Sequence, residues 1–303
     1  MRAVVFEEFG GPEVLGVREI DAPQAGAGQV RIAVKAAGVN PMDYKVRRGW
    51  FEAMMPTTFP AVPGVEVVGI VDEVGEGAEF AVGDEVVGWT VSGGYAEHAL
   101  LGNAVRKPAG VSWEQAVAVP VAGETAQRVL DLLKVKSGET LLLHGAAGAV
   151  GAVAVQLAVV AGVTVVGTAS EANHEYLRSL GATPVAYGDG LVDRVRAVAP
   201  VIDAVFDAAG QGGLKESIEL RGGPERIVTI ADMSAGELGI EVSPGGTAPE
   251  IVKGWLADQL QLAADGKLKL RIAETFPLTD ADAAKAQEIS ESGHAKGKLV
   301  LVP

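Results

Sequence analysis

The chain has 303 residues, of which 48% are hydrophobic and 21% charged, as expected of a globular protein with one large or two ordinary domains. It has no cysteine, which excludes disulfides, cysteine-ligated zinc, iron–sulfur clusters and thiol nucleophiles. Its formal net charge of −14 makes nucleic acids and anionic membranes poor partners. The N-terminal sequence MRAVVFEEFGGPE has acidic residues where a signal peptide needs an apolar run, so we expect a cytoplasmic protein.

Residues 1–118 have the pattern of a β-rich domain, in which short apolar runs alternate with turn signals. Glu76-Gly77 and the run VGDEV at 82–86 are typical of hairpin connections. This spacing predicts a compact, mostly antiparallel, barrel-like unit with few helices.

No Asp, Glu, Lys or Arg occurs from Thr140 through Ser170, and a stretch of about 20 apolar residues is long enough to cross a bilayer. The stretch nevertheless breaks into shorter pieces. A buried strand at 140–145 is followed by a glycine turn, a helix at 152–161 and a second strand at 163–168. This order predicts a βαβ unit with a right-handed crossover, and no membrane span.

The glycine turn matches the dinucleotide-binding fingerprint G-x-G-x-x-G with its first glycine replaced by Ala146. Small residues let a pyrophosphate approach the backbone N–H groups at the helix N-terminus, where the helix dipole favours negative charge. In the alternative interpretation these glycines only permit close packing of helix on strand. The expected cofactor contacts in the turn are Ala146, Ala147, Gly148, Ala149, Val150 and Gly151.

The end of the second strand indicates which cofactor binds. An NAD site needs a carboxylate there for the ribose, whereas this strand ends at Thr168 and is followed by Ser170. His174 and Arg178 lie within the next two turns, so we expect these four residues to favour NADP(H). Two alternatives stay open: Glu171 as a ribose ligand, and Ser170 as only a helix N-cap.

Two further apolar runs, 201–210 and 225–232, predict more strands of the same sheet. Ligands of open α/β sheets bind beyond the carboxyl ends of the strands. Ala208, Ile230 and Ala231 are therefore candidates for the wall of a nicotinamide pocket, although ordinary strand-to-helix turns have the same pattern.

The C-terminal residues again have the β-rich sequence pattern of residues 1–118. A capped helix is expected from about Thr279, and a final strand at 297–302. We expect residues 270–303 to complete the first domain, which is then discontinuous.

Several motifs in order resemble the medium-chain dehydrogenase/reductase superfamily, specifically its zinc-free NADPH:quinone oxidoreductase branch. The resemblance covers nearly the whole chain. It implies a GroES-like β-barrel domain for substrate and catalysis at 1–118 and 270–303, and a doubly wound Rossmann-type domain for the dinucleotide at 119–269. The motifs are GVNPMDYKVRRG (38–49), PAVPGVEVVGIVDEVG (60–75), VGDEVVG (82–88), GGYAEHA (93–99), PVAGETA (120–126), HGAAGAVG (144–151) and SGHAKGKLVL (292–301).

The resemblance also predicts that no metal is bound. Zinc members carry Cys, His and Cys ligands where this chain has Asn40, Val65 and, approximately, Ala122. The four histidines, at 98, 144, 174 and 294, are dispersed and show no ligand spacing.

Without a metal to stabilise an alkoxide, the expected reaction is hydride addition from NADPH to a quinone or an α,β-unsaturated carbonyl. Asn40 is the first choice for hydrogen bonding to the developing oxyanion, although a turn-forming Asn before Pro41 is the plain alternative. Lys45 is the second choice, as acid or polariser, at a place where many relatives have tyrosine. Tyr44 faces elsewhere if this stretch is extended. Asp43 is expected to orient its neighbours.

Three more cofactor contacts follow from the resemblance. Thr125 is expected near the nicotinamide, although Glu124 occupies an often apolar position. The Lys296-Gly297-Lys298 motif is expected near the cofactor, with a solvated charge pair as the alternative. Asn173 replaces a lysine common in the family, which weakens the preference for NADP(H).

Two other functions compete with a quinone or enone reductase. An enoyl-thioester reductase acting on acyl-CoA or acyl-carrier protein needs a basic pocket mouth, and Arg47-Arg48 is the only suggestive pair. A non-catalytic, crystallin-like NADP(H)-binding protein is the other. The family implies a homodimer. An apolar cluster follows the predicted catalytic segment and suggests a small hydrophobic substrate, although the same residues could equally form ordinary core. The cluster consists of Trp50, Phe51, Met54, Met55 and Phe59.

Overall fold

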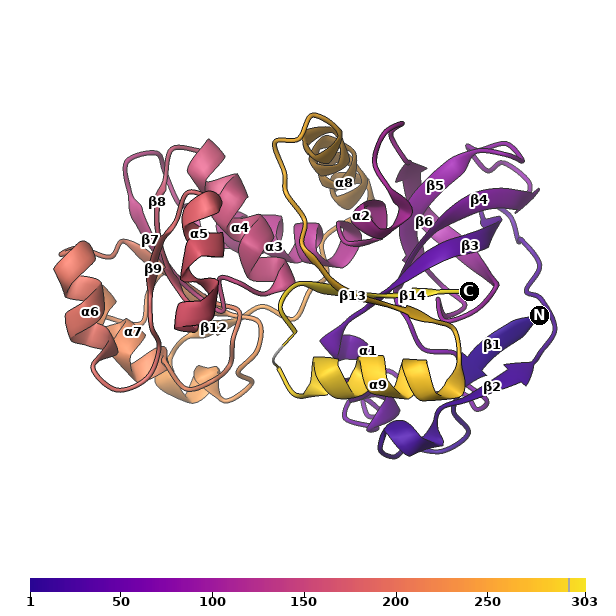
Figure 1. Cartoon of the computed structure of the whole chain (residues 1–303), viewed down its shortest axis with the longest axis horizontal. Helices are drawn as coiled ribbons and strands as arrows, with labels where there is room; N and C mark the ends of the chain where they lie inside the picture. Colours follow the sequence, from indigo (N-terminus) through magenta and orange to yellow (C-terminus); the bar gives the residue numbers. More distant parts are fainter. Residues whose placement is uncertain (294) are drawn as a thin grey trace. The chain divides into compact units, whose positions relative to one another are not determined.

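The computed structural model describes residues 1–293 and 295–303. The chain divides into two compact units (Figure 1). The first contains Met1–Val121 and Pro249–Pro303, and the second contains Ala122–Ala248. The first unit is therefore discontinuous in the chain.

The first unit is built on a six-stranded sheet in the order β13-β14-β3-β4-β5-β6, in which β3 also pairs with β6. That extra pairing gives the sheet its barrel-like closure. All neighbours are antiparallel except β13 and β14. The strands, with a separate antiparallel pair β1–β2, are β1 (Arg2–Val5), β2 (Gly16–Glu19), β3 (Val30–Val39), β4 (Glu66–Val74), β5 (Glu85–Thr90), β6 (His98–Arg106), β13 (Ile272–Pro277) and β14 (Lys298–Val302).

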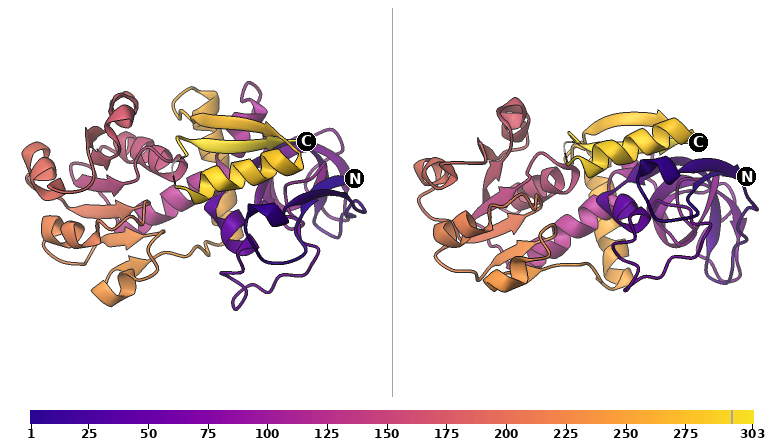
Figure 2. Two further views of the ribbon diagram at one scale, coloured as in Figure 1. Left: turned by 60° about the horizontal axis from the view of Figure 1, so that its bottom comes forward. Right: turned by 90° about the horizontal axis from the view of Figure 1, so that it is seen from below.

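Helix α9 (Asp280–Glu291) begins where the sequence predicted, because the Thr279 hydroxyl accepts a hydrogen bond from the Asp282 N–H at 3.2 Å. Helix α9, drawn in yellow, lies beside the indigo N-terminal segment, where it contacts the short helix η1 (Pro12–Val14) (Figure 2). The other helices of this unit are α1 (Pro41–Arg47), α2 (Trp113–Val117) and α8 (Pro249–Ala264).

The division of the chain differs from the predicted domain ranges at α8. Residues 249–269 were expected with the dinucleotide-binding domain, but α8 belongs to the first unit. The reason is packing: Leu256 and Leu260 are buried in a cluster with Val87 and Val300 of the β-rich sheet.

The second unit is a doubly wound parallel sheet in the order β12-β11-β10-β7-β8-β9. The direction in which strands are added reverses at β7, the topological switch point at which such sheets bind ligands. The predicted Rossmann-type architecture is confirmed. The strands are β7 (Thr140–His144), β8 (Thr164–Thr168), β9 (Thr183–Val185), β10 (Ala204–Asp207), β11 (Ile227–Thr229) and β12 (Glu241–Val242).

The βαβ unit forms as predicted, and α4 is only 12 residues long. Nowhere in residues 1–293 and 295–303 is a helix both long and apolar enough to span a bilayer. The helices around this sheet are α3 (Pro120–Leu133), α4 (Ala149–Val160), η2 (Glu171–Asn173), α5 (His174–Ser179), α6 (Leu191–Val198), α7 (Leu214–Arg221) and η3 (Ala235–Leu238).

Candidate functional site

The segment that holds the four predicted catalytic residues is helical. Asn40 is the N-cap of α1, Pro41 takes the first helical position, and the Asp43 carboxylate accepts the Asn40 backbone N–H at 2.8 Å. Strand β3 therefore runs directly into α1. Tyr44 and Lys45 are separated by the helical period, not by the strand alternation that we considered for an extended stretch.

Asp43 forms a buried pair with Tyr95, whose hydroxyl donates to Asp43 Oδ2 at 2.8 Å. Both residues are buried, and Asp43 Oδ1 has no hydrogen-bond partner among the described residues. Loss of solvation disfavours the charged carboxylate and raises the pKa of Asp43 to about 7. Burial and the neighbouring carboxylate also raise the pKa of Tyr95 well above its usual value.

A second buried group joins three separate elements. Asn40 Nδ2 donates to Glu66 Oε1 on β4 at 2.8 Å, and Lys298 Nζ on β14 donates to Asn40 Oδ1 at 2.6 Å. Lys298 and Glu66 also form an ion pair, and Glu66 Oε2 accepts the Val121 N–H at 2.7 Å. We call Asn40, Glu66 and Lys298 the Asn40 triad; their exposed fractions are 5%, 0% and 3%.

The positions that hold zinc in metal-dependent members do not suit a metal in this chain. The side chains of Val65 and Ala122 have no atom that could bind a metal, and both polar atoms of the Asn40 side chain are engaged by Glu66 and Lys298. The Lys298 ammonium already supplies a positive charge beside Glu66. Within residues 1–293 and 295–303, no group of three or more His, Cys, Asp or Glu could hold a metal ion. His294 lies outside the described residues.

Lys45 is half-buried, and burial lowers its pKa. In the part of the chain that the structure describes, its ammonium has no hydrogen-bond or ion-pair partner, so its proton is not committed elsewhere. Tyr44 lies edge-on to the exposed Trp50, with ring centroids 5.9 Å apart. Burial and the charge of Glu291 raise the pKa of Tyr44.

The residues proposed as core or substrate contacts after α1 are mostly exposed. Trp50, Met54 and Met55 are 62%, 70% and 52% exposed, which argues against the core interpretation for these three. Phe59 is half-covered by edge contacts with Phe6 and Phe9.

The two arginines suggested for a thioester cofactor are engaged within the fold. The Arg47 side chain is fully buried and donates to Gln287 Oε1 at 2.6 Å and to the Gly10 carbonyl at 2.6 Å. Glu291 forms ion pairs with Arg47 at 3.1 Å and with Arg48 at 2.7 Å. Arg47 is therefore not available at a pocket mouth.

The glycine turn between β7 and α4 has little room for side chains. Gly145 has φ +71°, and a Cβ on Gly151 would lie 2.2 Å from the Gly145 carbonyl oxygen and 2.7 Å from Ala146 Cα. Gly148 is the N-cap of α4 and, as a glycine, it offers no side chain to cap the helix. The turn thus places uncapped N–H groups at the positive end of a 12-residue helix, which suits a pyrophosphate.

The four residues predicted to favour NADP(H) lie on three different elements: β8, the start of η2, and α5. Thr168 is buried, and its hydroxyl lies 3.2 Å from Nδ1 of His144. Ser170 is the N-cap residue of η2, but its side chain makes no capping hydrogen bond. Its hydroxyl oxygen instead accepts a hydrogen bond from Asn173 Nδ2 at 3.1 Å. His174 and Arg178 lie on α5, where Arg178 is exposed.

His144 was considered only as a metal ligand, but it fixes the end of β7. Its Nε2 lies 2.9 Å from the Ser217 hydroxyl on α7, and its Nδ1 lies near Thr168. Burial lowers the pKa of His144, so the ring is neutral at pH 7 and can donate from one nitrogen while accepting at the other.

The ends of β10 and β11 are joined by a buried hydrogen bond from the Thr229 hydroxyl to Asp207 Oδ2 at 2.8 Å. Asp207 also accepts the N–H groups of Ala209 and Gly210, and Thr229 accepts those of Ala231 and Asp232. These bonds fix both turns. The predicted contacts Ala208, Ile230 and Ala231 lie in these turns and are partly exposed.

The structure gives a reason for the charged residue beside Thr125. The Glu124 carboxylate accepts from Arg128 at 2.7 Å, from the Thr247 hydroxyl at 2.9 Å and from the Thr125 hydroxyl at 3.3 Å. Arg128 also contacts Ser243. Glu124 is therefore satisfied inside a polar network.

The C-terminal motif divides into two parts. Lys296 is exposed, whereas the Lys298 ammonium is committed to the Asn40 triad. Gly297 lies between them with φ +130°, and a Cβ there would lie 2.3 Å from the Arg271 carbonyl oxygen.

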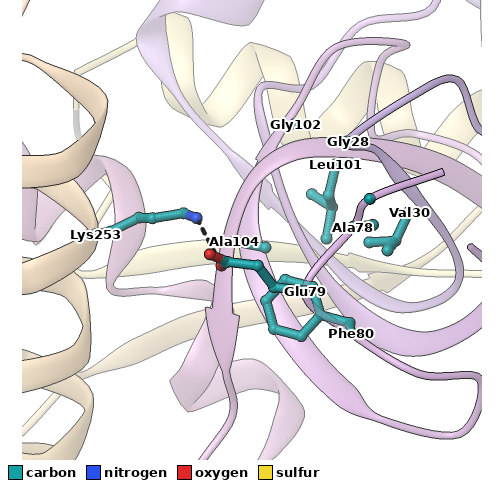
Figure 3. A pocket seen from close by; sticks show the side chains of 10 residues that line it. Gly28, Val30, Ala78, Glu79, Phe80, Leu101, Gly102, Ala104 and Lys253 are labelled. Carbon is teal, nitrogen blue, oxygen red and sulfur yellow. Dashed lines mark hydrogen bonds and ion pairs between the residues drawn. The ribbon is translucent and has the colours of Figure 1, made fainter. Parts of the chain in front are cut away.

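A pocket elsewhere in the first unit carries little chemistry (Figure 3). Its charged side chains, Glu79 and Lys253, pair with each other at 3.2 Å. The remaining lining consists of glycines and apolar residues such as Phe80 and Leu101.

Sequence reasoning missed Glu66, Tyr95 and the Asn40 contact of Lys298. A signal was present: Glu66 and Lys298 each begin a strand whose next residues are apolar, VVGIV and LVLV. A charge in such a run is buried only when it is paired.

Comparisons with known proteins agree with this architecture. Residues 26–129 match the alcohol dehydrogenase GroES-like domain, and residues 180–301 match the family described as zinc-binding dehydrogenase. The quinone oxidoreductase of Homo sapiens is 32% identical, over 100% of this chain and 98% of that protein.

Two further relatives extend the comparison. The chloroplastic NADPH-dependent alkenal/one oxidoreductase of Arabidopsis thaliana is 30% identical, over 100% of this chain and 80% of that protein. The structure of Escherichia coli quinone oxidoreductase complexed with NADPH matches with a TM-score of 0.88 and 26% identity, over 100% of both chains. The chain therefore belongs to the medium-chain dehydrogenase/reductase superfamily, in its quinone oxidoreductase branch.

Proposed function

We propose that this protein is a zinc-independent, NADPH-dependent reductase that transfers hydride to a quinone or an α,β-unsaturated carbonyl. The observation that carries the proposal is the glycine turn at the switch point of the parallel sheet. It leaves no room for a Cβ at Gly151 and offers an uncapped helix N-terminus. The similarity to quinone and alkenal/one oxidoreductases supports the substrate class.

The second unit is proposed to hold the dinucleotide and the first to hold the substrate. The turn residues are assigned to the pyrophosphate, and Ser170, His174 and Arg178 to the 2′-phosphate. The Thr168 and Lys298 side chains are engaged within the fold, so we assign these two a role through their backbone. The remaining proposed cofactor contacts are Thr125, Ala208, Ile230, Ala231, Lys296 and Gly297.

Bound NADPH supplies the hydride. The residues of the chain must then stabilise the negative charge that develops on the carbonyl oxygen and deliver a proton. We assign the stabilisation of this charge to the remaining N–H of the Asn40 side chain, which donates a hydrogen bond to the carbonyl oxygen. We assign the proton to Lys45, whose lowered pKa and unpartnered ammonium among the described residues suit a general acid. Asp43 orients this segment through Asn40, and Tyr44 shapes its surface.

No observation favours the competing functions. The basic pair suggested for a thioester cofactor is held by Glu291. The similarity to quinone and alkenal/one oxidoreductases supports an enzyme over a non-catalytic cofactor-binding protein.

The proposal includes a cytoplasmic homodimer formed through the edge strands of the parallel sheet, of which β12 is one. Sedimentation velocity of the purified chain tests the dimer, and a monomer at micromolar concentration would contradict it.

The function is tested by steady-state turnover with 9,10-phenanthrenequinone and simple enones, followed by loss of NADPH absorbance. We expect saturable consumption of NADPH with at least one acceptor. Oxidation of primary alcohols with NADP⁺ but no reduction of any quinone or enone would contradict the proposal.

A further inference from the structure

The side-chain amide of Asn40 is held at both ends by opposite charges. Its oxygen accepts from the Lys298 ammonium at 2.6 Å, and its nitrogen donates to the Glu66 carboxylate at 2.8 Å. An ammonium only donates and a carboxylate only accepts, so a flipped amide would lose both bonds. The amide therefore has one orientation.

The two charged groups are themselves fixed. Glu66 Oε2 accepts the Val121 N–H at 2.7 Å, and Lys298 pairs with Glu66 Oε1. Gly38 lies opposite Glu66 on the adjacent strand and leaves room for the Glu66 carboxylate, because a Cβ at Gly38 would lie 2.3 Å from Glu66 Oε1. Lys298 and Glu66 are practically inaccessible, so neither can itself contact a substrate.

We propose that Lys298 and Glu66 are positioning residues that present the second Nδ2 hydrogen of Asn40 to the substrate carbonyl oxygen. The Lys298 cation at the amide oxygen draws electron density from the amide nitrogen and so strengthens the remaining N–H as a donor. The Glu66 carboxylate holds the first N–H and thereby fixes the direction of the second. This assignment rests on the proposed reductase function. It gives the Lys298 side chain a role in catalysis and none in cofactor binding.

The test is a double-mutant cycle on the full chain with Asn40→Ala and Lys298→Met, with Lys298→Arg as the conservative variant. For Lys298→Met we expect kcat to fall by about 10-fold to 100-fold, as for other supporting residues, and the NADPH dissociation constant to change by less than about 2-fold. Lys298→Arg is expected to recover most of kcat. In the Asn40→Ala background, Lys298→Met should cost nothing further.

If Lys298→Met does not fold, Glu66→Gln/Lys298→Met replaces it, because removing both charges avoids an unpaired buried ion. An equal loss of kcat with and without Asn40 would overturn the proposal. Weaker NADPH binding with unchanged kcat would overturn it as well.

An NMR measurement separates this proposal from the function on which it rests. The two Asn40 side-chain N–H resonances are expected to be widely separated and protected from exchange in the unliganded protein, and to converge in Lys298→Met. If the resonances converge in Lys298→Met but the wild-type chain turns over no quinone or enone, the fixed amide is supported and the reductase function is refuted. Resonances unchanged by Lys298→Met would refute the positioning role.

Discussion

The Asn40 triad and the glycine turn are built on opposite physical principles. In the first unit, the amide side chain of a helix cap and two charged side chains from strands are brought together out of water. In the second unit, side chains are removed so that the backbone itself is the binding surface.

The difference predicts how each region fails. Added volume should disable the turn, because a Cβ on Gly151 meets backbone atoms that cannot move aside. A changed charge should disable the region around Asn40, because buried ionisable groups interact strongly at low dielectric. Four substitutions test this contrast, in order of decreasing expected effect.

Gly151→Ala is expected to have the largest effect. Its Cβ would push α4 away from the turn, so we expect nucleotide affinity to fall by about 1,000-fold, or about 4 kcal/mol, in a calorimetric titration. Gly236→Ala in the same unit is the matched control, because a Cβ there has nothing within 4 Å. Equal affinities of the two variants, with both folded by circular dichroism, would contradict the role of the turn.

Asp43→Asn is expected to change how stability depends on pH. The folded-state pKa of Asp43 is about 7 against 3.8 for the exposed group, so between these values the folded chain keeps a proton that the unfolded chain loses. This contribution to the free energy of unfolding is complete below pH 4 and is lost as the pH rises to 7, by at most about 4 kcal/mol. Urea unfolding at several pH values measures it.

The asparagine variant should lack this contribution. The unfolding free energy of the wild type should therefore fall steadily relative to that of the variant from pH 4 to pH 7. A difference that stays constant across this range would show that Asp43 is ionised throughout.

Lys45→Met tests the assignment of the proton donor. We expect kcat for an enone to fall by about 100-fold, because the acid that delivers the proton is removed. The exposed Lys35→Met, on strand β3 of the same unit, is the control for loss of one surface charge. If both variants retained wild-type kcat, the proton would come from another group.

Arg178→Ala should have the smallest effect. Loss of an exposed cation near the proposed 2′-phosphate site is expected to weaken NADPH binding by about 10-fold, or about 1.4 kcal/mol, and to leave NADH binding unchanged. Arg196→Ala on α6, where Arg196 pairs with the exposed Glu219, is the control. Equal losses for both nucleotides would place Arg178 away from the phosphate.

The parallel sheet and its turn were predictable because their signals are local. Apolar strands flank small residues at fixed spacing, and steric limits at Gly151 act within one βαβ unit. The Asn40 triad was not predictable as a group, because it depends on the pairing of β14 with β3 and of β3 with β4. Only the fold brings Lys298 to Asn40.

Two local misreadings have identifiable causes. The helix at 41–47 was signalled by Asn40 as cap, Pro41 at the first position and Asp43 at the third, but we gave weight to an extended alternative. Helix α8 belongs to the first unit because Leu256 and Leu260 are buried in the core of that unit. The spacing of residues along the chain does not reveal this packing.

Calorimetric titration of the purified chain with NADPH and NADH in parallel tests whether the glycine turn binds a dinucleotide. We expect NADPH to bind once per chain, with a dissociation constant about 10-fold below that of NADH. If neither nucleotide binds, the glycine turn serves only the packing of α4 on β7, and the proposed reductase function is wrong.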